Sequence, residues 1–160
     1  MEQKQPMTEK GYNKLSDEIK DLKLVQRPAI IIAVDEARQL GDLKENAEYH
    51  AARDKQRFID ARLTELSTMI LQAQIIDPSK LTHERISFGS TVDLVDIDTD
   101  EEITYTIVGD VESDVTNNII SINSPLAKQL LSKEEGEEVT VNLPSGKKEF
   151  EIDKIYYKEF

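Results

Sequence analysis

The stretch at residues 41–50, GDLKENAEYH, lies between two long helical patterns and constrains the fold more than any other part of the chain. Gly41 is typical of a helix end, because glycine readily adopts the left-handed conformation at which helices commonly stop. Asp42, with Glu45 three positions later, indicates a capping box that opens the next helix. The sequence therefore predicts that the chain turns back here and forms a helical hairpin.

Three carboxylates gather at this turn, those of Asp42, Glu45 and Glu48. Residues three apart on a helix share a face, so we expect an acidic tip at the end of the hairpin. One interpretation is structural, because acidic side chains cap helices and are favourable near their N-termini. The other is that the tip is presented to a partner, since like charges at such spacing cost roughly 0.2–0.5 kcal/mol per pair. The spacing alone favours the structural interpretation.

The two segments that flank the turn have the apolar spacing of a coiled coil. The first helix is expected to begin at Thr8, whose hydroxyl can cap the first turn. Pro28 is expected to kink or briefly break it, because an interior proline lacks a backbone donor and clashes with the preceding turn. The second helix is expected to end near Asp77. At 1.5 Å per residue, helices of about thirty residues make arms roughly 45 Å long. The expected contact positions are Leu15, Ile19, Leu22, Ala29, Ala33 and Leu40 in the first helix, and Ile59, Leu63, Leu66, Ile70 and Ala73 in the second.

From Ser87 onward the apolar pattern changes from helical to alternating, which is typical of strands. Ser124 can cap, and Pro125 can open, a short helix that reaches Leu131. The parity of the last strand shifts before Ile155, as a β-bulge would cause. Strands are expected around residues 88–94, 103–107, 118–122, 139–143 and 150–157.

The predicted fold class is therefore α+β, with two domains. Residues 1–77 are expected to form an antiparallel two-helix coiled-coil hairpin with an acidic tip. Residues 78–83 are expected to be a linker. Residues 84–160 are expected to form a mostly antiparallel β domain with one short helix.

The charge distribution restricts the partners of each half. The whole chain has a net charge of −12, which opposes tight binding to free nucleic acid because a polyanion is repelled. Residues 1–83 carry 13 basic and 14 acidic side chains, whereas residues 84–160 carry 7 and 18. Only the first half is therefore expected to approach a phosphate backbone.

Other features of the composition point to a cytoplasmic protein. There is no cysteine, which excludes disulfides and thiolate metal sites and fits a reducing compartment. No apolar run has the length needed to cross a bilayer, and residues 1–6 lack a secretory signature, so no membrane partner is expected.

Residues 41–53, GDLKENAEYHAAR, resemble the tip signature of the bacterial Gre transcript cleavage factors. The resemblance extends over nearly the whole chain, because other short features fall where that family places them. A thirteen-residue match is more specific than a lone capping box, and it reverses the preference for the structural interpretation of the tip. The other matching features are Arg27 with Pro28, the NSPLA segment at residues 123–127, Gly136 and Gly146.

The resemblance implies that the hairpin enters the secondary channel of RNA polymerase after the enzyme has backtracked and extruded the RNA 3′ end. Asp42 and Glu45 would then help to hold a second Mg²⁺ and its attacking water, while the polymerase performs the hydrolysis. The implied protein is thus an accessory factor and not an enzyme. It needs no cofactor when free and shares Mg²⁺ with RNA polymerase in the complex. Nothing in the sequence demands more than a monomer.

The family resemblance also gives roles to basic and docking residues. Arg38 and Arg53, with Arg57 one turn further on, would form a basic patch that contacts the extruded RNA. Without the resemblance, an ordinary solvated surface is the better explanation of these three residues. Ser124 and Pro125 would lie near the contact through which the second domain docks on the polymerase.

The sequence predicts a structural role for His50 and no metal site at His83. Tyr49 and His50 can either contact the RNA end or pack at the tip, and we expect His50 to pack there. His83 has no His or Cys companion, which argues against a metal site.

Two other functions are compatible with this sequence. The family's second domain resembles the FK506-binding-protein fold, which suggests a peptidyl-prolyl isomerase or a peptide-binding chaperone, but fold similarity alone carries little functional weight. The domain has no tryptophan and few aromatic residues with which to line an isomerase pocket. A competitor that occupies the polymerase channel without promoting cleavage is the second alternative. The aromatic residues are Phe88, Tyr105, Phe150, Tyr156, Tyr157 and Phe160.

Overall fold

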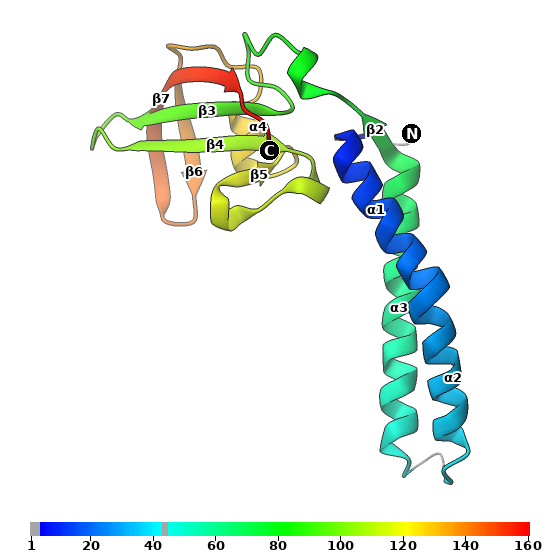
Figure 1. Ribbon diagram of the computed structural model, residues 1–160. Helices are drawn as coiled ribbons and strands as arrows, with labels where there is room; N and C mark the ends of the chain where they lie inside the picture. Colours follow the sequence, from blue (N-terminus) through cyan, green and yellow to red (C-terminus); the bar gives the residue numbers. More distant parts are fainter. Residues whose placement is uncertain (1–3, 43–44) are drawn as a thin grey trace. The chain divides into compact units, whose positions relative to one another are not determined.

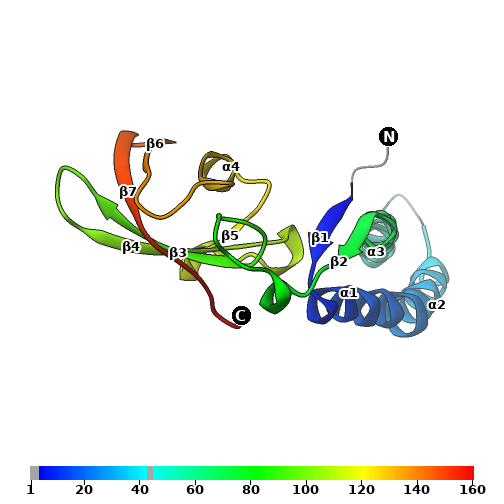
Figure 2. The ribbon, with the colours of Figure 1, turned by 90° about the horizontal axis from the view of Figure 1, so that it is seen from above.

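A computed structural model describes residues 4–42 and 45–160 of the chain (Figure 1). These residues form two units, a helical one at residues 12–73 and a sheet-containing one made of residues 4–11 and 74–160. Residues 4–11 therefore group with the second unit, whereas the sequence pattern assigned them to the first. The cause is a two-stranded sheet between β1 (Gln5–Met7) and β2 (Ala73–Ile75), visible in Figure 2, which no periodicity in such short segments reveals. Over the described ranges, the helices are too short or too polar for any of them to span a lipid bilayer.

The first arm of the hairpin comprises α1 (Glu9–Asp21), a π-helical turn η1 (Leu22–Gln26) and α2 (Arg27–Arg38). The predicted start is confirmed, because Thr8 Oγ1 accepts a hydrogen bond from the Gly11 N–H at 3.1 Å. The expected break at Pro28 is replaced by the π turn, in which the Arg27 N–H donates to the Leu22 carbonyl. A π turn is wider than an α turn, so the chain passes the proline while it remains helical.

The π turn moves the apolar seam of the first arm by one residue. Leu15 and Leu22 are buried as predicted, but Ala29 and Leu40 are exposed. The buried positions beyond the turn are instead Ile30, Val34 and Ala37. The predicted seam was wrong there because a π turn adds one residue to the helical repeat, and the sequence pattern assumed an uninterrupted repeat.

The second arm is α3 (Ala47–Gln72), which buries Ile59, Leu63 and Leu66 as predicted. It ends at Gln72, earlier than expected, because Ala73 is extended and enters β2. Arg62 joins the arms through two hydrogen bonds to Glu18, at 2.9 and 3.2 Å, which raise the pKa of the guanidinium above its usual value.

The second unit contains a curled mixed sheet in the order β5-β4-β3-β7-β6. Its strands are β3 (Ser90–Asp96), β4 (Glu102–Val108), β5 (Ile119–Ser121), β6 (Glu138–Leu143) and β7 (Gly146–Tyr157). All neighbours are antiparallel except β4 and β5, which are parallel. The predicted bulge is confirmed, because Asp93 pairs with Lys154 and Leu94 with Ile152, so that Asp153 is the extra residue. The predicted fold class, a helical hairpin followed by a sheet domain with a short helix, is therefore confirmed.

The core of this unit lies between the sheet and α4 (Pro125–Leu130), which packs against β6 (Figure 2). The Ser124 hydroxyl caps α4 by accepting from the Ala127 N–H at 3.2 Å, as predicted. Three single-turn 3₁₀ helices complete the unit: η2 (Pro78–Lys80), η3 (Asp110–Glu112) and η4 (Val115–Asn117). The buried core side chains are Ile86, Val92, Leu94, Ile107, Ile120, Ala127, Leu130, Val139, Val141, Phe150, Ile152 and Ile155.

Candidate functional site

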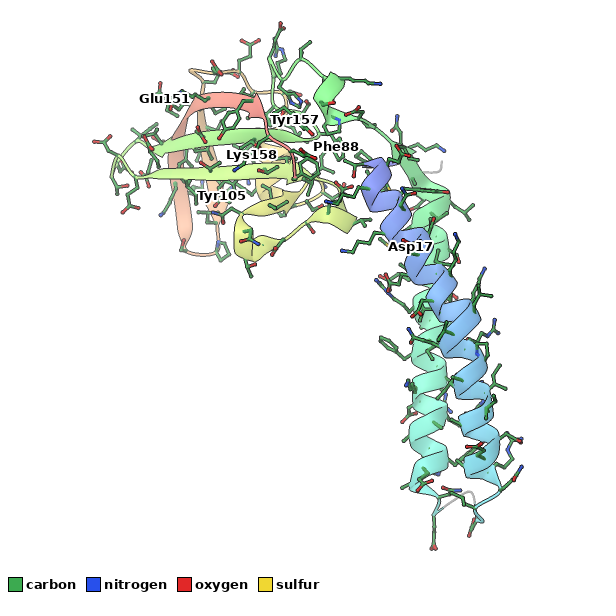
Figure 3. The ribbon with its side chains drawn as sticks, viewed as in Figure 1. Asp17, Phe88, Tyr105, Glu151, Tyr157 and Lys158 are labelled. Atoms are coloured by element: carbon green, nitrogen blue, oxygen red, sulfur yellow. The ribbon has the colours of Figure 1, made fainter. Side chains whose placement is uncertain are left out.

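The turn between α2 and α3 carries the two carboxylates that the sequence singled out. Asp42 and Glu45 are both exposed, and Gly41 has a positive φ of 134°, as a helix-ending glycine allows. The intervening residues 43 and 44 of the motif lie outside the described residues. Polar side chains at this end of the hairpin extend away from the helices (Figure 3). The end of the hairpin is therefore open to a partner on the side where Asp42 and Glu45 stand.

The predicted capping box between Asp42 and Glu45 was wrong, because α3 begins only at Ala47. Asn46 is the N-cap, and its Oδ1 accepts from the Tyr49 N–H at 3.0 Å. Asp42 and Glu45 thus precede the helix and do not share a helical face with Glu48. Asn46 therefore performs the capping role that the structural explanation of the acidic tip gave to Asp42.

Asn46 also connects the two arms, a role that the sequence analysis missed. Its Nδ2 donates to the carbonyl of Ala37 near the end of α2, while its Oδ1 caps α3. A second connection lies beside it, where the Arg38 guanidinium stands 5.9 Å from the centroid of the Tyr49 ring, within the range of a cation–π contact. Asparagine is among the best N-caps, so its place directly before the helical pattern was the signal available in the sequence.

We expect Asn46→Ala to destabilise the hairpin by about 0.5–2 kcal/mol, because the variant loses the cap of α3. Asn46→Asp keeps the acceptor but removes the donor to Ala37, so it should lose less stability. Denaturant unfolding of the two variants and the parent protein measures the difference. Equal stability of all three proteins would contradict the assigned capping role.

His50 and the basic side chains near the tip have distinct partners. His50 is exposed and makes an edge-to-face contact with the neighbouring Tyr49, with ring centroids 5.6 Å apart. Arg53 donates to Gln56 at 2.7 Å, and Arg57 forms an ion pair with Asp54 at 2.7 Å. Arg38 and Arg53 line one shallow groove on the hairpin, and Arg57 is not part of its lining. The structure thus brings together two of the three predicted basic residues. The other residues of the groove are Ile31, Ile32, Val34, Asp35, Glu36 and Gln56.

Ser124, which is half-buried, precedes α4, and Pro125 is its first residue. The Ser124 hydroxyl donates to the Ser121 carbonyl at 2.6 Å, which fixes the loop before the helix, and Pro125 is exposed. A rigid loop with an exposed proline can contact another protein with little loss of conformational entropy.

The comparisons with known proteins agree on one family. A family described as "Transcription elongation factor, N-terminal" matches residues 5–75, and one described as "Transcription elongation factor, GreA/GreB, C-term" matches residues 81–157. A protein of Aliarcobacter butzleri named "Transcription elongation factor GreA" is 60% identical over 157 residues, which cover 98% of each chain. This chain belongs to the GreA/GreB family of transcription elongation factors. A Sulfurovum protein of the same name is 57% identical, and the match covers 98% of this chain and 97% of the Sulfurovum chain.

The family resemblance inferred from residues 41–53 is therefore confirmed, and the GreA/GreB similarity spans both units. Among solved structures, the GreA factor homolog Gfh1 of Thermus thermophilus is 26% identical, with 96% of this chain and 99% of that chain covered and a TM-score of 0.46.

The carboxylate oxygens at the tip of this GreA/GreB family member are suitable ligands for a metal ion whose other ligands come from a partner. Within residues 4–42 and 45–160, no three His, Asp or Glu side chains are arranged to enclose a metal ion. Mg²⁺ typically takes one or two protein carboxylates and completes its octahedron with water and phosphate oxygens. The exposed carboxylates of Asp42 and Glu45 fit that demand, provided that the remaining ligands come from a partner.

His83 is engaged by protein groups at both ring nitrogens. Nδ1 lies 2.7 Å from Ser90 Oγ, and Nε2 lies 2.6 Å from the carbonyl of Pro78. The ring also stacks on Tyr157, which is labelled in Figure 3, at 5.7 Å between centroids. Both ring nitrogens of His83 therefore contact groups of the protein itself, Ser90 and Pro78.

Proposed function

We propose that this protein acts on RNA polymerase during elongation, inserts its acidic hairpin tip into the secondary channel, and stimulates the polymerase's own Mg²⁺-dependent cleavage of backtracked RNA. The observation that carries the proposal is the exposure of Asp42 and Glu45 at the end of a two-helix hairpin, on a chain of the GreA/GreB family. The N-cap of α3 is Asn46, so both carboxylates stand before the helix begins.

Each carboxylate would act by position and charge. Asp42 and Glu45 would supply oxygen ligands at a metal centre whose other ligands belong to the polymerase and the RNA. A second Mg²⁺ at such a centre stabilises the attacking and leaving oxygens of a displacement at phosphorus. The contribution of this chain would be to complete the ligand set and to orient the water, which is catalysis by preorganised electrostatics.

The basic residues near the tip would contact the extruded RNA. Arg38 and Arg53 share one groove, and neither is held in an ion pair by the residues that the structure describes. Arg57 is paired with Asp54 and would contribute less, because its charge is partly neutralised. Each phosphate contact made by an arginine would release counterions. The stimulation of cleavage by this protein should therefore weaken as the salt concentration rises.

This protein would therefore be an accessory factor that has no nuclease activity of its own. The polymerase would provide the active centre, and the factor would work as a monomer in the cytoplasm with Mg²⁺ shared only in the complex.

The proposal is tested with a purified elongation complex that has been stalled and backtracked. Adding this protein with Mg²⁺ should shorten the RNA from its 3′ end and restore elongation, whereas the protein alone should leave free RNA intact. Occupancy of the polymerase without any shortening would instead identify a competitor that blocks the channel. Gel analysis of the labelled RNA distinguishes these results.

We expect Pro125→Ala to weaken the affinity for polymerase, because the variant changes an exposed residue of the proposed docking loop while Ser124 still caps α4. Competition binding against labelled parent protein measures the change. Lys128→Ala, at an exposed position in the same helix, is the matched control for general damage to α4. A defect in cleavage at unchanged affinity would show that the loop does not dock.

A further inference from the structure

The docking loop, residues 121–125, is bonded to the turn η3. The Asp110 carboxylate faces this loop with both of its oxygens. Its Oδ1 accepts from the hydroxyl of Ser121, and its Oδ2 accepts from Nδ2 of Asn123 at 3.2 Å. Asp110 thus fixes two side chains of the segment that leads directly to Pro125.

The docking loop is also bonded within itself. The Asn123 N–H donates to Ser121 Oγ at 3.0 Å, and the Ser124 N–H donates to the Ser121 carbonyl at 2.9 Å. Ser121 Oγ connects two bonds, because it donates to Asp110 and accepts from the backbone of Asn123. The backbone of the loop is therefore fixed through a side chain that Asp110 holds.

The first strand of the second unit supports the same loop. Nδ2 of Asn123 donates to Gln5 Oε1 at 2.8 Å as well as to Asp110, so the two N–H groups of this amide have two acceptors. Gln5 belongs to β1 and lies in the same unit as the docking loop. The Asn123 side chain is therefore held by two segments, and one of them is far from it in the sequence.

Close contact with η3 fixes the position of the strand that carries Gln5. A Cβ placed on Gly109, directly before η3, would overlap the carbonyl oxygen of Pro6, a backbone atom that cannot move aside unless the strand moves. At the other end of η3, Glu112 Oε1 accepts from the Thr8 N–H at 2.8 Å. The segment that contains Gln5 therefore lies along η3, the same turn that bonds to the docking loop.

We infer that Asp110 is a positioning residue, which together with Gln5 holds the docking loop in the shape that polymerase binds. The inference rests on the proposed function, in which Ser124 and Pro125 lie at the contact with polymerase. A loop that is already ordered loses little conformational entropy when it binds, so preorganisation raises affinity without adding a contact. All of these bonds lie within the second unit, so the role concerns binding and not the chemistry at the tip.

The decisive variant is Asp110→Ala, which removes both acceptors from the docking loop. Competition binding should show an affinity for polymerase that is roughly three- to tenfold weaker, as the loss of one or two exposed hydrogen bonds allows. The rate of RNA cleavage at saturating factor should stay at the parent value, because the tip is unchanged.

Asp114→Ala is the matched control and should keep the parent affinity. Asp114 also holds a neighbouring turn, through bonds to Thr116 and Asn117. Among the described residues, its carboxylate bonds to none of the docking loop.

Asp110→Asn separates positioning from a direct ionic contact. This variant keeps one acceptor oxygen and removes the charge, so it should lose less affinity than Asp110→Ala. Equal losses in the two variants would show that the charge itself contacts polymerase and would overturn the inference. Gln5→Ala should also weaken binding, to a smaller extent, because it removes one acceptor and no charge.

Amide hydrogen exchange in the free protein measures the order of the loop itself. Exchange at residues 121–124 should be faster in Asp110→Ala than in the parent protein and unchanged in Asp114→Ala. Weaker binding without faster exchange would mean that Asp110 contacts polymerase directly. Faster exchange without weaker binding would mean that the order of the loop does not affect docking. Either result would overturn the inference.

Pro125→Ala in the same competition assay distinguishes this inference from the proposed function. If Pro125→Ala binds weakly while Asp110→Ala binds like the parent protein, only the positioning role fails. If both variants bind like the parent protein, the docking role proposed for the loop fails. Competition binding does not require cleavage, so a parent protein that binds without stimulating cleavage would refute the proposed function and still leave the affinities of the variants measurable.

Discussion

Replacing Asp42 by asparagine is expected to abolish stimulated RNA cleavage while the protein still binds RNA polymerase. The substitution preserves the size of the side chain but removes the charge that a divalent cation requires. Removal of one preorganised electrostatic group from an active centre typically lowers rates by roughly 10²–10³-fold, and we expect a loss in that range. Glu45→Gln should have a similar effect. Cleavage of a backtracked complex at saturating factor measures the rate.

Glu48→Gln is the matched control, because Glu48 is an exposed carboxylate in the first turn of α3. It should leave cleavage nearly unchanged, since Glu48 belongs to the helix surface and not to the turn. Competition binding should give the same affinity for all the variants. If Asp42→Asn lost binding and cleavage in parallel, the carboxylate would be a docking group and its metal role would be refuted.

Leu66→Ala is expected to destabilise the hairpin by about 2–5 kcal/mol, because it creates a cavity where a fully buried side chain packs between the arms. Leu66 is 0% exposed and lies on the seam of α3. Leu71→Ala changes the same residue type on the same helix, but Leu71 is 76% exposed. That control should change stability by no more than about 0.5 kcal/mol.

Denaturant unfolding followed by circular dichroism measures both variants. A small effect at Leu66, or equal effects at the two positions, would show that the arms do not depend on this seam. The Leu66 variant should also stimulate cleavage less at higher temperature, where its hairpin is partly unfolded, whereas the Leu71 variant should match the parent protein.

Repeating patterns in the sequence correctly predicted the features that are set by residues close together in the sequence. The buried positions Ile59, Leu63 and Leu66 follow from helical periodicity. Alternation gave the strands, and its change of parity gave the bulge at Asp153. The cap at Ser124 was also predictable, because a serine followed by a proline satisfies the first turn of a helix locally.

The sequence-based predictions were wrong where a short segment could form either of two local structures. Asp42 and Asn46 are both good N-caps, and the sequence alone did not show that the helix starts after Asn46. Asn46 is the N-cap in the structure, where its Nδ2 also donates to the carbonyl of Ala37 on the other arm. The shift of the seam from Ala29 to Ile30 has a similar origin, because a π turn before Pro28 is one of several ways to accommodate a proline in a helix.

The sequence by itself therefore determined the hairpin, the order of the strands along the chain, the family and the tip residues. Each of these can be inferred from the spacing of residues or from a contiguous motif. Only the tertiary structure decided which side chains the tip leaves exposed, that Arg38 and Arg53 share a groove without Arg57, and that Asn123 is bonded to Gln5, which lies 118 positions away. The physical reason is that such hydrogen bonds and contacts join segments that are distant in sequence. The secondary-structure preferences of short segments do not specify such long-range contacts.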